Sequence, residues 1–195
     1  MRVRMLPALL LACACSGEGR YLVSPALRAI VDTRVAVLPF DNNSAEPGAA
    51  GIMRALAAEG LSRRGYLALP AEEVDGFLKK LRHPGGVVLT AEQGRSLGAG
   101  LLCYGSVEEF AFQRLDLVVR KEVRLRLEIV DAATGETLFE GSGSGKDFKS
   151  FPDQAAAKSY FLEQLSRGGG VPPAPALTRE TRMAVAQVLD RLPRR

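Results

Sequence analysis

Residues 33–40 read TRVAVLPF, and this stretch decides the fold that the sequence predicts. From Val35 to Leu38 it is continuously apolar, which is typical of a central strand that is buried on both faces. A helical spacing of apolar residues follows over 49–64, and Gly65 stands where a helix usually ends. A second short apolar run covers 66–70. Strand, helix and strand in this order predict a parallel βαβ unit.

The next segments predict more helices and then a change of period. A helix is expected over 72–81, and a second one runs to Leu97 from Thr90, which has Gln93 in the spacing of a capping box. After a strand over 101–112, apolar and charged residues alternate over 123–129, as in a strand with one face in water. A turn over 131–135 and a returning strand over 136–144 complete an antiparallel meander.

The expected fold class is therefore α/β. It has a mixed sheet with an N-terminal parallel βαβ half and a C-terminal antiparallel meander, and helices pack on the sheet. Further helices are expected over 154–165 and from Thr178 onward, the last one burying Met183, Val185, Val188 and Leu192. We divide the chain into a signal peptide (1–12), a tether (13–32), the α/β domain (33–149) and a C-terminal helical extension with a Gly/Pro linker (150–195).

Composition and charge restrict the function. The 195 residues are 47% hydrophobic and 25% charged, which is ordinary for one globular domain with extensions. No apolar run is long enough for a transmembrane helix. Arg2 and Arg4 supply two of the four net positive charges, so only +2 remains after the leader. This charge is too small to favour a nucleic-acid partner.

The N-terminus has the pattern of an export signal. MRVRMLPALLLA (1–12) places two arginines before a short apolar run. The following Leu10-Leu11-Ala12-Cys13 resembles the lipobox of bacterial lipoproteins, in which the cysteine thiol accepts a diacylglyceryl group. Three acyl chains on that residue would anchor a protein stably in a bilayer. Cys15 is an alternative acceptor, and either position is kept as the lipidation site.

The expected location of the protein is the outer membrane. The residues that follow the two cysteines are Ala14 and Ser16. Neither is the aspartate that retains such lipoproteins at the inner membrane. The resemblance therefore implies a lipid-anchored protein that faces the periplasm.

Elsewhere the sequence gives few candidates for chemistry. Cys103 stands alone in an apolar segment and is expected to be an inert core residue. His83 is the only histidine and lies in a predicted loop. GSGSGK (141–146) lacks the spacing of a phosphate-binding loop and is expected to belong to a strand. We expect no catalytic residue, metal ligand or cofactor.

One loop is a candidate ligand-binding site. Asp41, Asn42, Asn43 and Ser44 are turn-forming residues that follow the central strand and precede a helix. Ligands of open α/β sheets bind at this place, beyond the carboxyl ends of the strands.

Several segments together resemble a known family. VAVLPFDN (35–42), GYLALP (65–70), LGAGLLCYGSV (97–107) and RLEIVDAATGETL (126–138) resemble bacterial lipoproteins catalogued as domain of unknown function 799. The similarity covers roughly 33–145. The chain is also similar to a wider group of envelope proteins with folds like the curli-secretion lipoprotein CsgG and the TolB N-terminal domain. The resemblance implies an accessory in envelope assembly or export, beside a CsgG-like partner, and offers no catalytic residues to transfer.

Three classes of function are consistent with the sequence. The favoured one is an anchored binding or assembly protein, not an enzyme, whose partners are the lipid bilayer and an envelope protein. It would show an exposed apolar or strand-edge surface. An envelope hydrolase would instead need paired loop carboxylates in one pocket. The third class is a cytoplasmic nucleotide or nucleic-acid binder whose N-terminus only imitates a leader.

Overall fold

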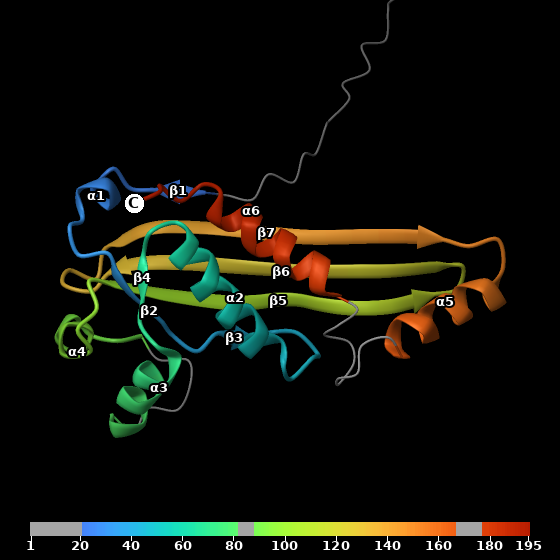
Figure 1. Cartoon of the computed structure of the whole chain (residues 1–195), viewed down its shortest axis with the longest axis horizontal. Coiled ribbons are helices and arrows are strands. Elements are labelled where there is room, and N and C mark those ends of the chain that lie inside the picture. The colour runs from blue at the N-terminus through green and yellow to red at the C-terminus, as the bar shows by residue number, and fades with distance from the viewer. Residues whose placement is uncertain (1–20, 82–87, 167–176) are drawn as a thin grey trace, which may run out of the picture.

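A single mixed sheet forms the frame of the protein (Figure 1). The computed structural model describes residues 21–81, 88–166 and 177–195. Within them, seven strands join in one sheet with the order β1-β7-β6-β5-β2-β4, and β3 pairs with β5. The strands are β1 (Leu22–Val23), β2 (Arg34–Val37), β3 (Asp41–Asn42), β4 (Leu67–Ala68), β5 (Leu101–Leu115), β6 (Val118–Asp131) and β7 (Thr137–Ser150). The predicted α/β class with a mixed sheet is confirmed.

The parallel half has the predicted topology. β2 lies between β4 and β5 and runs parallel to both. Helix α2 (Ala49–Arg63) connects β2 to β4, and Gly65 follows it at φ +90°, a left-handed conformation that glycine adopts without strain. Helices α3 (Ala71–Lys80) and α4 (Ala91–Ser96) come next. Thr90 and Gln93 form the capping box that the sequence indicates.

The antiparallel half is longer than expected. β5, β6 and β7 form an extended three-stranded arm that projects beyond the parallel half (Figure 1). The predicted strand over 101–112 continues to Leu115, and the returning strand predicted over 136–144 begins at Thr137 and continues to Ser150. The distal residues are mostly polar or charged, so hydrophobic alternation gives no sign of them, whereas backbone pairing extends to the tip.

Two hydrophobic clusters lie on opposite faces of the sheet. The alternation of Val35 and Val37 with Ala36 and Leu38 sends β2 side chains into both. One cluster is covered by α2, by α5 (Gln154–Ser166) and by α6 (Thr178–Leu189), and the other packs against α3 and the residues that flank α4. In Figure 1, α2 and α6 lie side by side across the same face.

Three local predictions need correction. Asp41 and Asn42 do not belong to a turn, because they form β3 and pair with β5. α6 has Leu177, not Thr178, at its capping position. Met183 is 41% exposed instead of buried, whereas Thr181 is buried. The spacing of apolar residues alone does not show which face of the helix contacts the sheet.

Glycines of β7 set the position of α6. A Cβ atom at Gly143 would lie 2.1 Å from the carbonyl oxygen of Ala184, and one at Gly145 would lie 2.0 Å from that of Glu180. The helix therefore rests directly on the strand backbone. The GSGSGK segment is part of a strand, as expected, and its small residues allow a helix to pack closely against the strand backbone.

The segment 21–32, expected to belong to the tether, adds two small elements. β1 pairs with β7, and α1 (Ala26–Ala29) buries Leu27 completely. Among the described residues no helix is long and apolar enough to cross a membrane. Cys13, Cys15, His83 and the linker over 168–175 lie outside the described residues.

Candidate functional site: the open face of the arm

The arm has one face that α2, α5 and α6 do not cover. Along β6, Val123, Leu125, Leu127 and Ile129 enter the core beneath the helices, so the residues between them point the other way. We term this surface the open face. It comprises Tyr104, Ser106 and Glu109 of β5, Arg120, Glu122, Arg124, Arg126 and Glu128 of β6, and Glu140, Ser142, Ser144 and Lys146 of β7. The predicted wet face of the strand over 123–129 is confirmed.

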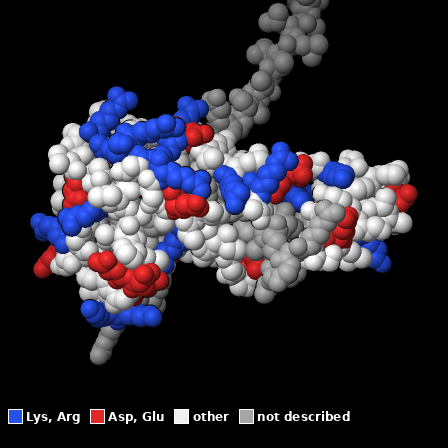
Figure 2. Space-filling model, viewed as in Figure 1, with Lys and Arg blue, Asp and Glu red and all other residues white. Residues whose placement is uncertain are grey.

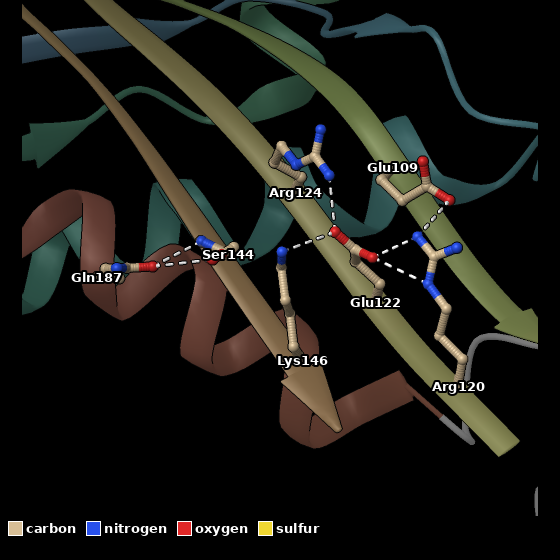
Figure 3. Close-up of polar contacts among 7 residues, drawn as sticks. All are labelled: Glu109, Arg120, Glu122, Arg124, Ser144, Lys146 and Gln187. Atoms are coloured by element: carbon tan, nitrogen blue, oxygen red, sulfur yellow. Dashed lines mark hydrogen bonds and ion pairs between the residues drawn. The ribbon is translucent and has the colours of Figure 1, made fainter. Parts of the chain in front are cut away.

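A network of charges occupies the middle of the open face (Figure 3). The Glu122 side chain is only 4% exposed, although it lies on a sheet face without a covering helix. Its Oε1 lies 2.7 Å from Nη2 of Arg124 and 3.2 Å from Nζ of Lys146. Its Oε2 accepts from Nε of Arg120 at 2.9 Å. Arg120 also approaches Glu109 at 3.8 Å, so the network crosses all three strands.

The electrostatics fix Glu122 as an anion. Burial by itself would raise the pKa of this carboxyl, but the hydrogen bonds from Arg124, Arg120 and Lys146 outweigh burial and lower the pKa to about 2. A general acid or base needs a pKa near the working pH. Glu122 is therefore suited to holding three cationic side chains in place, not to proton transfer at neutral pH.

A crevice of about 340 Å³ opens where the arm meets the parallel half. Asp41, Leu89, Tyr104, Glu128 and Thr137 are among its lining residues. The N–H of Leu89 donates to the Tyr104 hydroxyl at 3.1 Å, and the Thr137 hydroxyl donates to Glu128 Oε1 at 2.7 Å. Burial, reinforced by the charge of Glu128, raises the pKa of Tyr104, so its hydroxyl keeps its proton.

The structure separates the four residues of the candidate ligand-binding loop. Asp41 lines the crevice. Asn42, at the end of β3, instead stabilises the turn that follows this strand, since its Oδ1 accepts from the Ser44 N–H at 3.1 Å and its Nδ2 donates to the Glu46 carbonyl at 2.7 Å. Asn43 donates to Glu108 at 3.5 Å. Of the predicted loop, Asp41 is thus the residue placed to meet a ligand in this crevice.

The crevice brings together groups that the sequence does not connect. Asp41 and Glu128 both line it, and they come from strands 87 positions apart in the chain. Their oxygens, with the Tyr104 hydroxyl, could bind hydroxyl or amide groups of a small ligand. The two carboxylates are also the arrangement that the hydrolase alternative requires. Among the described residues, no three potential ligands gather to hold a metal ion.

Cys103 lies in the core and away from the open face. Its side chain is completely buried, and burial raises the pKa of the thiol to about 12. The predicted burial of this thiol is confirmed, and the raised pKa disfavours the reactive thiolate at neutral pH.

The arm also presents a strand edge and an apolar tip. β1 pairs with β7 only at Phe139 and Glu140, so over 141–150 no other described strand pairs with the outer side of β7. The Ser144 N–H on that side donates to Oε1 of Gln187 at 2.6 Å (Figure 3). At the tip, Leu115, Leu117 and Phe148 are 51%, 39% and 59% exposed. These are the surfaces expected of a binding or assembly protein.

Comparison with known proteins locates the fold. No family model and no curated protein matches the sequence, so membership of the domain of unknown function 799 is not confirmed. The structure is similar to lipoprotein GNA1162 from Neisseria meningitidis, at 22% identity and a TM-score of 0.55, over 69% of this chain and 98% of that one. It is also similar to a leucine-to-methionine variant of the PelC dodecamer from Paraburkholderia phytofirmans. That match has 22% identity, a TM-score of 0.50, and covers 77% of this chain and 97% of that one. The protein therefore has a fold that also occurs in a bacterial lipoprotein.

Proposed function

We propose that this protein is an exported bacterial lipoprotein that acts, without catalysis, as a binding or assembly accessory in the cell envelope. The observation that carries the proposal is the lipobox-like end of the leader in front of a domain with the fold of lipoprotein GNA1162. The lipid would attach to Cys13 or Cys15 and hold the domain on the periplasmic side of the outer membrane. A CsgG-like export partner remains a prediction from the sequence alone.

The titratable groups support a binding role over catalysis. Glu122 is held ionised by three cations, and the Cys103 thiol is held protonated by burial. Neither state suits a group that must gain or lose a proton during turnover. The crevice with Asp41 and Glu128 then serves as a recognition site on the open face. If the double change Asp41→Asn with Glu128→Gln abolished a hydrolytic activity of the wild type, the hydrolase alternative would replace this proposal.

Assembly would proceed through the arm, with a second copy of the chain as the occupant. The outer side of β7, which pairs with no described strand over 141–150, and the exposed apolar side chains of the tip favour strand or tip contacts between subunits. The PelC structure with a similar fold is a dodecamer.

The lipidation test uses metabolic labelling with an alkyne analogue of palmitate. The wild type should carry label in the membrane fraction, and the double variant Cys13→Ala/Cys15→Ala should carry none. Loss of label in one single variant identifies the acceptor, and label that survives both single changes means that either cysteine serves. A soluble, unlabelled wild-type product would overturn the lipoprotein proposal.

The assembly test measures the mass of detergent-solubilised protein by light scattering. The wild type should form a discrete oligomer, and Leu115→Glu with Phe148→Glu at the tip should reduce it to smaller species. Val31→Glu with Leu67→Glu is the matched control, because these side chains are 94% and 62% exposed and neither belongs to β5, β6 or β7. A monomeric wild type, or equal effects of the two variants, would refute assembly through the arm.

A further inference from the structure

Arginine side chains from three parts of the chain meet around α6. We term this surface the arginine face: Arg63 and Arg64 at the end of α2, Arg179, Arg182 and Arg191 on and after α6, and Arg194 and Arg195 near the C-terminus. Two acidic side chains, Glu59 and Asp190, lie among them. In Figure 2, Lys and Arg side chains gather over this region. The open face lies on the other side of the sheet, because α2 and α6 cover the face opposite to it.

A groove of about 330 Å³ runs along the arginine face between α2 and α6. Arg63, Arg64, Arg182 and Arg194 line it, and Val185 and Leu189 are among the apolar residues at its base. The helices are close here, since a Cβ atom at Gly60 would lie 2.4 Å from a methyl carbon of Leu189. The groove is thus shallow, cationic at its rim and apolar beneath.

Only part of this charge is used within the protein. Arg64 bonds the Leu192 carbonyl at 2.8 Å and Asp190 at 2.6 Å, and Arg195 bonds carbonyls of α1, so both hold the C-terminus in place. Arg63 pairs with Glu59 but is 72% exposed. Within the described part of the chain, Arg179, Arg182, Arg191 and Arg194 have no ion-pair partner. Complementing the C-terminus of α6 accounts for Arg191 and Arg194, but it does not account for Arg179 and Arg182, which lie in the first half of the helix.

The arginine face adjoins the place where the leader joins the domain. The guanidinium of Arg191 stacks over the ring of Tyr21, the first described residue, at 4.9 Å. The eight residue steps from Cys13 to Tyr21 span at most about 28 Å. An anchor at Cys13 would therefore hold this surface within a short distance of the bilayer.

We propose that the arginine face binds the phosphate headgroups of the membrane into which the lipid anchor inserts. The inference rests on the proposed lipoprotein function for the position of the bilayer, and on the unpaired guanidinium groups for the chemistry. Arginine forms two parallel hydrogen bonds with a phosphate and is weakly hydrated, which suits it to this contact. The anchor and the face together would hold the domain in one orientation, with the open face turned away from the lipid.

The test is vesicle binding by the full chain carrying Cys13→Ala and Cys15→Ala, which cannot be acylated. Binding to vesicles of phosphatidylcholine with phosphatidylglycerol should exceed binding to phosphatidylcholine alone and should weaken at high salt. Adding Arg63→Glu, Arg182→Glu and Arg194→Glu should weaken binding by more than about 100-fold, since each arginine near an anionic surface contributes roughly fivefold and each glutamate adds repulsion. The leader is common to all variants and does not affect the comparison.

The matched control carries Lys79→Glu, Lys80→Glu and Lys158→Glu, three exposed cations outside the arginine face. It has the same net charge as the arginine variant and should keep most of the binding, and circular dichroism should show both variants folded. Equal losses in the two variants, or none in either, would overturn the inference. The inference would also be overturned if the arginine variant lost its binding to soluble polyphosphate but kept its binding to vesicles.

The two proposals fail separately. Arginine-dependent vesicle binding in a chain whose wild type carries no palmitate label would support the face and refute the anchor. A labelled wild type whose unacylated form shows no arginine dependence would support the anchor and refute the face.

Discussion

Replacing Gly143 of β7 by alanine tests how closely α6 rests on the sheet. The added methyl would lie 2.1 Å from the Ala184 carbonyl oxygen and 2.7 Å from a methyl carbon of Val188. The nearest atom belongs to the helix backbone, which cannot rotate away as a side chain would. The helix must therefore move outward by about 1 Å to restore ordinary contact.

The magnitude follows from what that movement exposes. Val185, Val188 and Leu189 are at most 6% exposed, and burial of three such side chains stabilises the fold by about 6 kcal/mol. A gap of about 1 Å removes a quarter to a half of the contact energy, or about 1.5–3 kcal/mol. Alanine also restricts the unfolded chain, which stabilises the folded protein by about 0.5–1 kcal/mol. The net expected loss is about 2 kcal/mol, which lowers Tm by roughly 4–8 °C for a chain of this size.

The assay is urea and thermal unfolding followed by circular dichroism. Gly51→Ala is the matched control, because a Cβ atom there meets nothing within 4 Å and the residue lies inside α2. It should stabilise the protein by about 0.5–1 kcal/mol. If Gly143→Ala left the unfolding midpoint unchanged or raised it as Gly51→Ala does, the close contact of α6 with β7 would be refuted.

Three further outcomes are expected. The folded pKa of Glu122 is about 2, below its usual 4.5, so its contribution of about 3 kcal/mol is complete above pH 4.5 and is lost as the pH falls toward 2. Urea midpoints at pH 7 and pH 3 should therefore differ less in Glu122→Gln than in wild type, and equal differences would contradict the network. In the chain without leader cysteines, Cys103 should react with an aromatic disulfide reagent only after denaturant is added, because the thiol is buried and its pKa is about 12. Rapid labelling of the native protein would contradict that burial. Thr90→Ala should lower the unfolding free energy by about 1 kcal/mol through loss of the capping box, with Ser96→Ala as the control, since the Ser96 hydroxyl only bonds a carbonyl within its own helix.

Local sequence determined the elements whose causes lie within a few residues. The apolar run from Val35 to Leu38 required a strand buried on both faces, and a helix and a second strand within about 35 residues required a parallel βαβ unit. Gly65 and the Thr90–Gln93 pair marked a helix end and a helix start, because capping depends on neighbouring backbone groups. Alternation along 123–129 assigned each side chain to the core or to the open face.

Tertiary structure decided whatever depends on residues that are distant in the chain. Glu122 looks like a surface residue in sequence, and it is buried because cations on its own strand and on β7 surround it. Met183 faces solvent because glycines of β7, some 40 residues earlier, select the face of α6 that contacts the sheet. The arginine face has the same origin. The cluster at 191–195 reads alone as a solvated helix end, and only the packing of α6 against α2 brings it beside Arg63 and Arg182. Local pattern encodes backbone conformation, whereas surface charge and burial are set by which elements the fold places together.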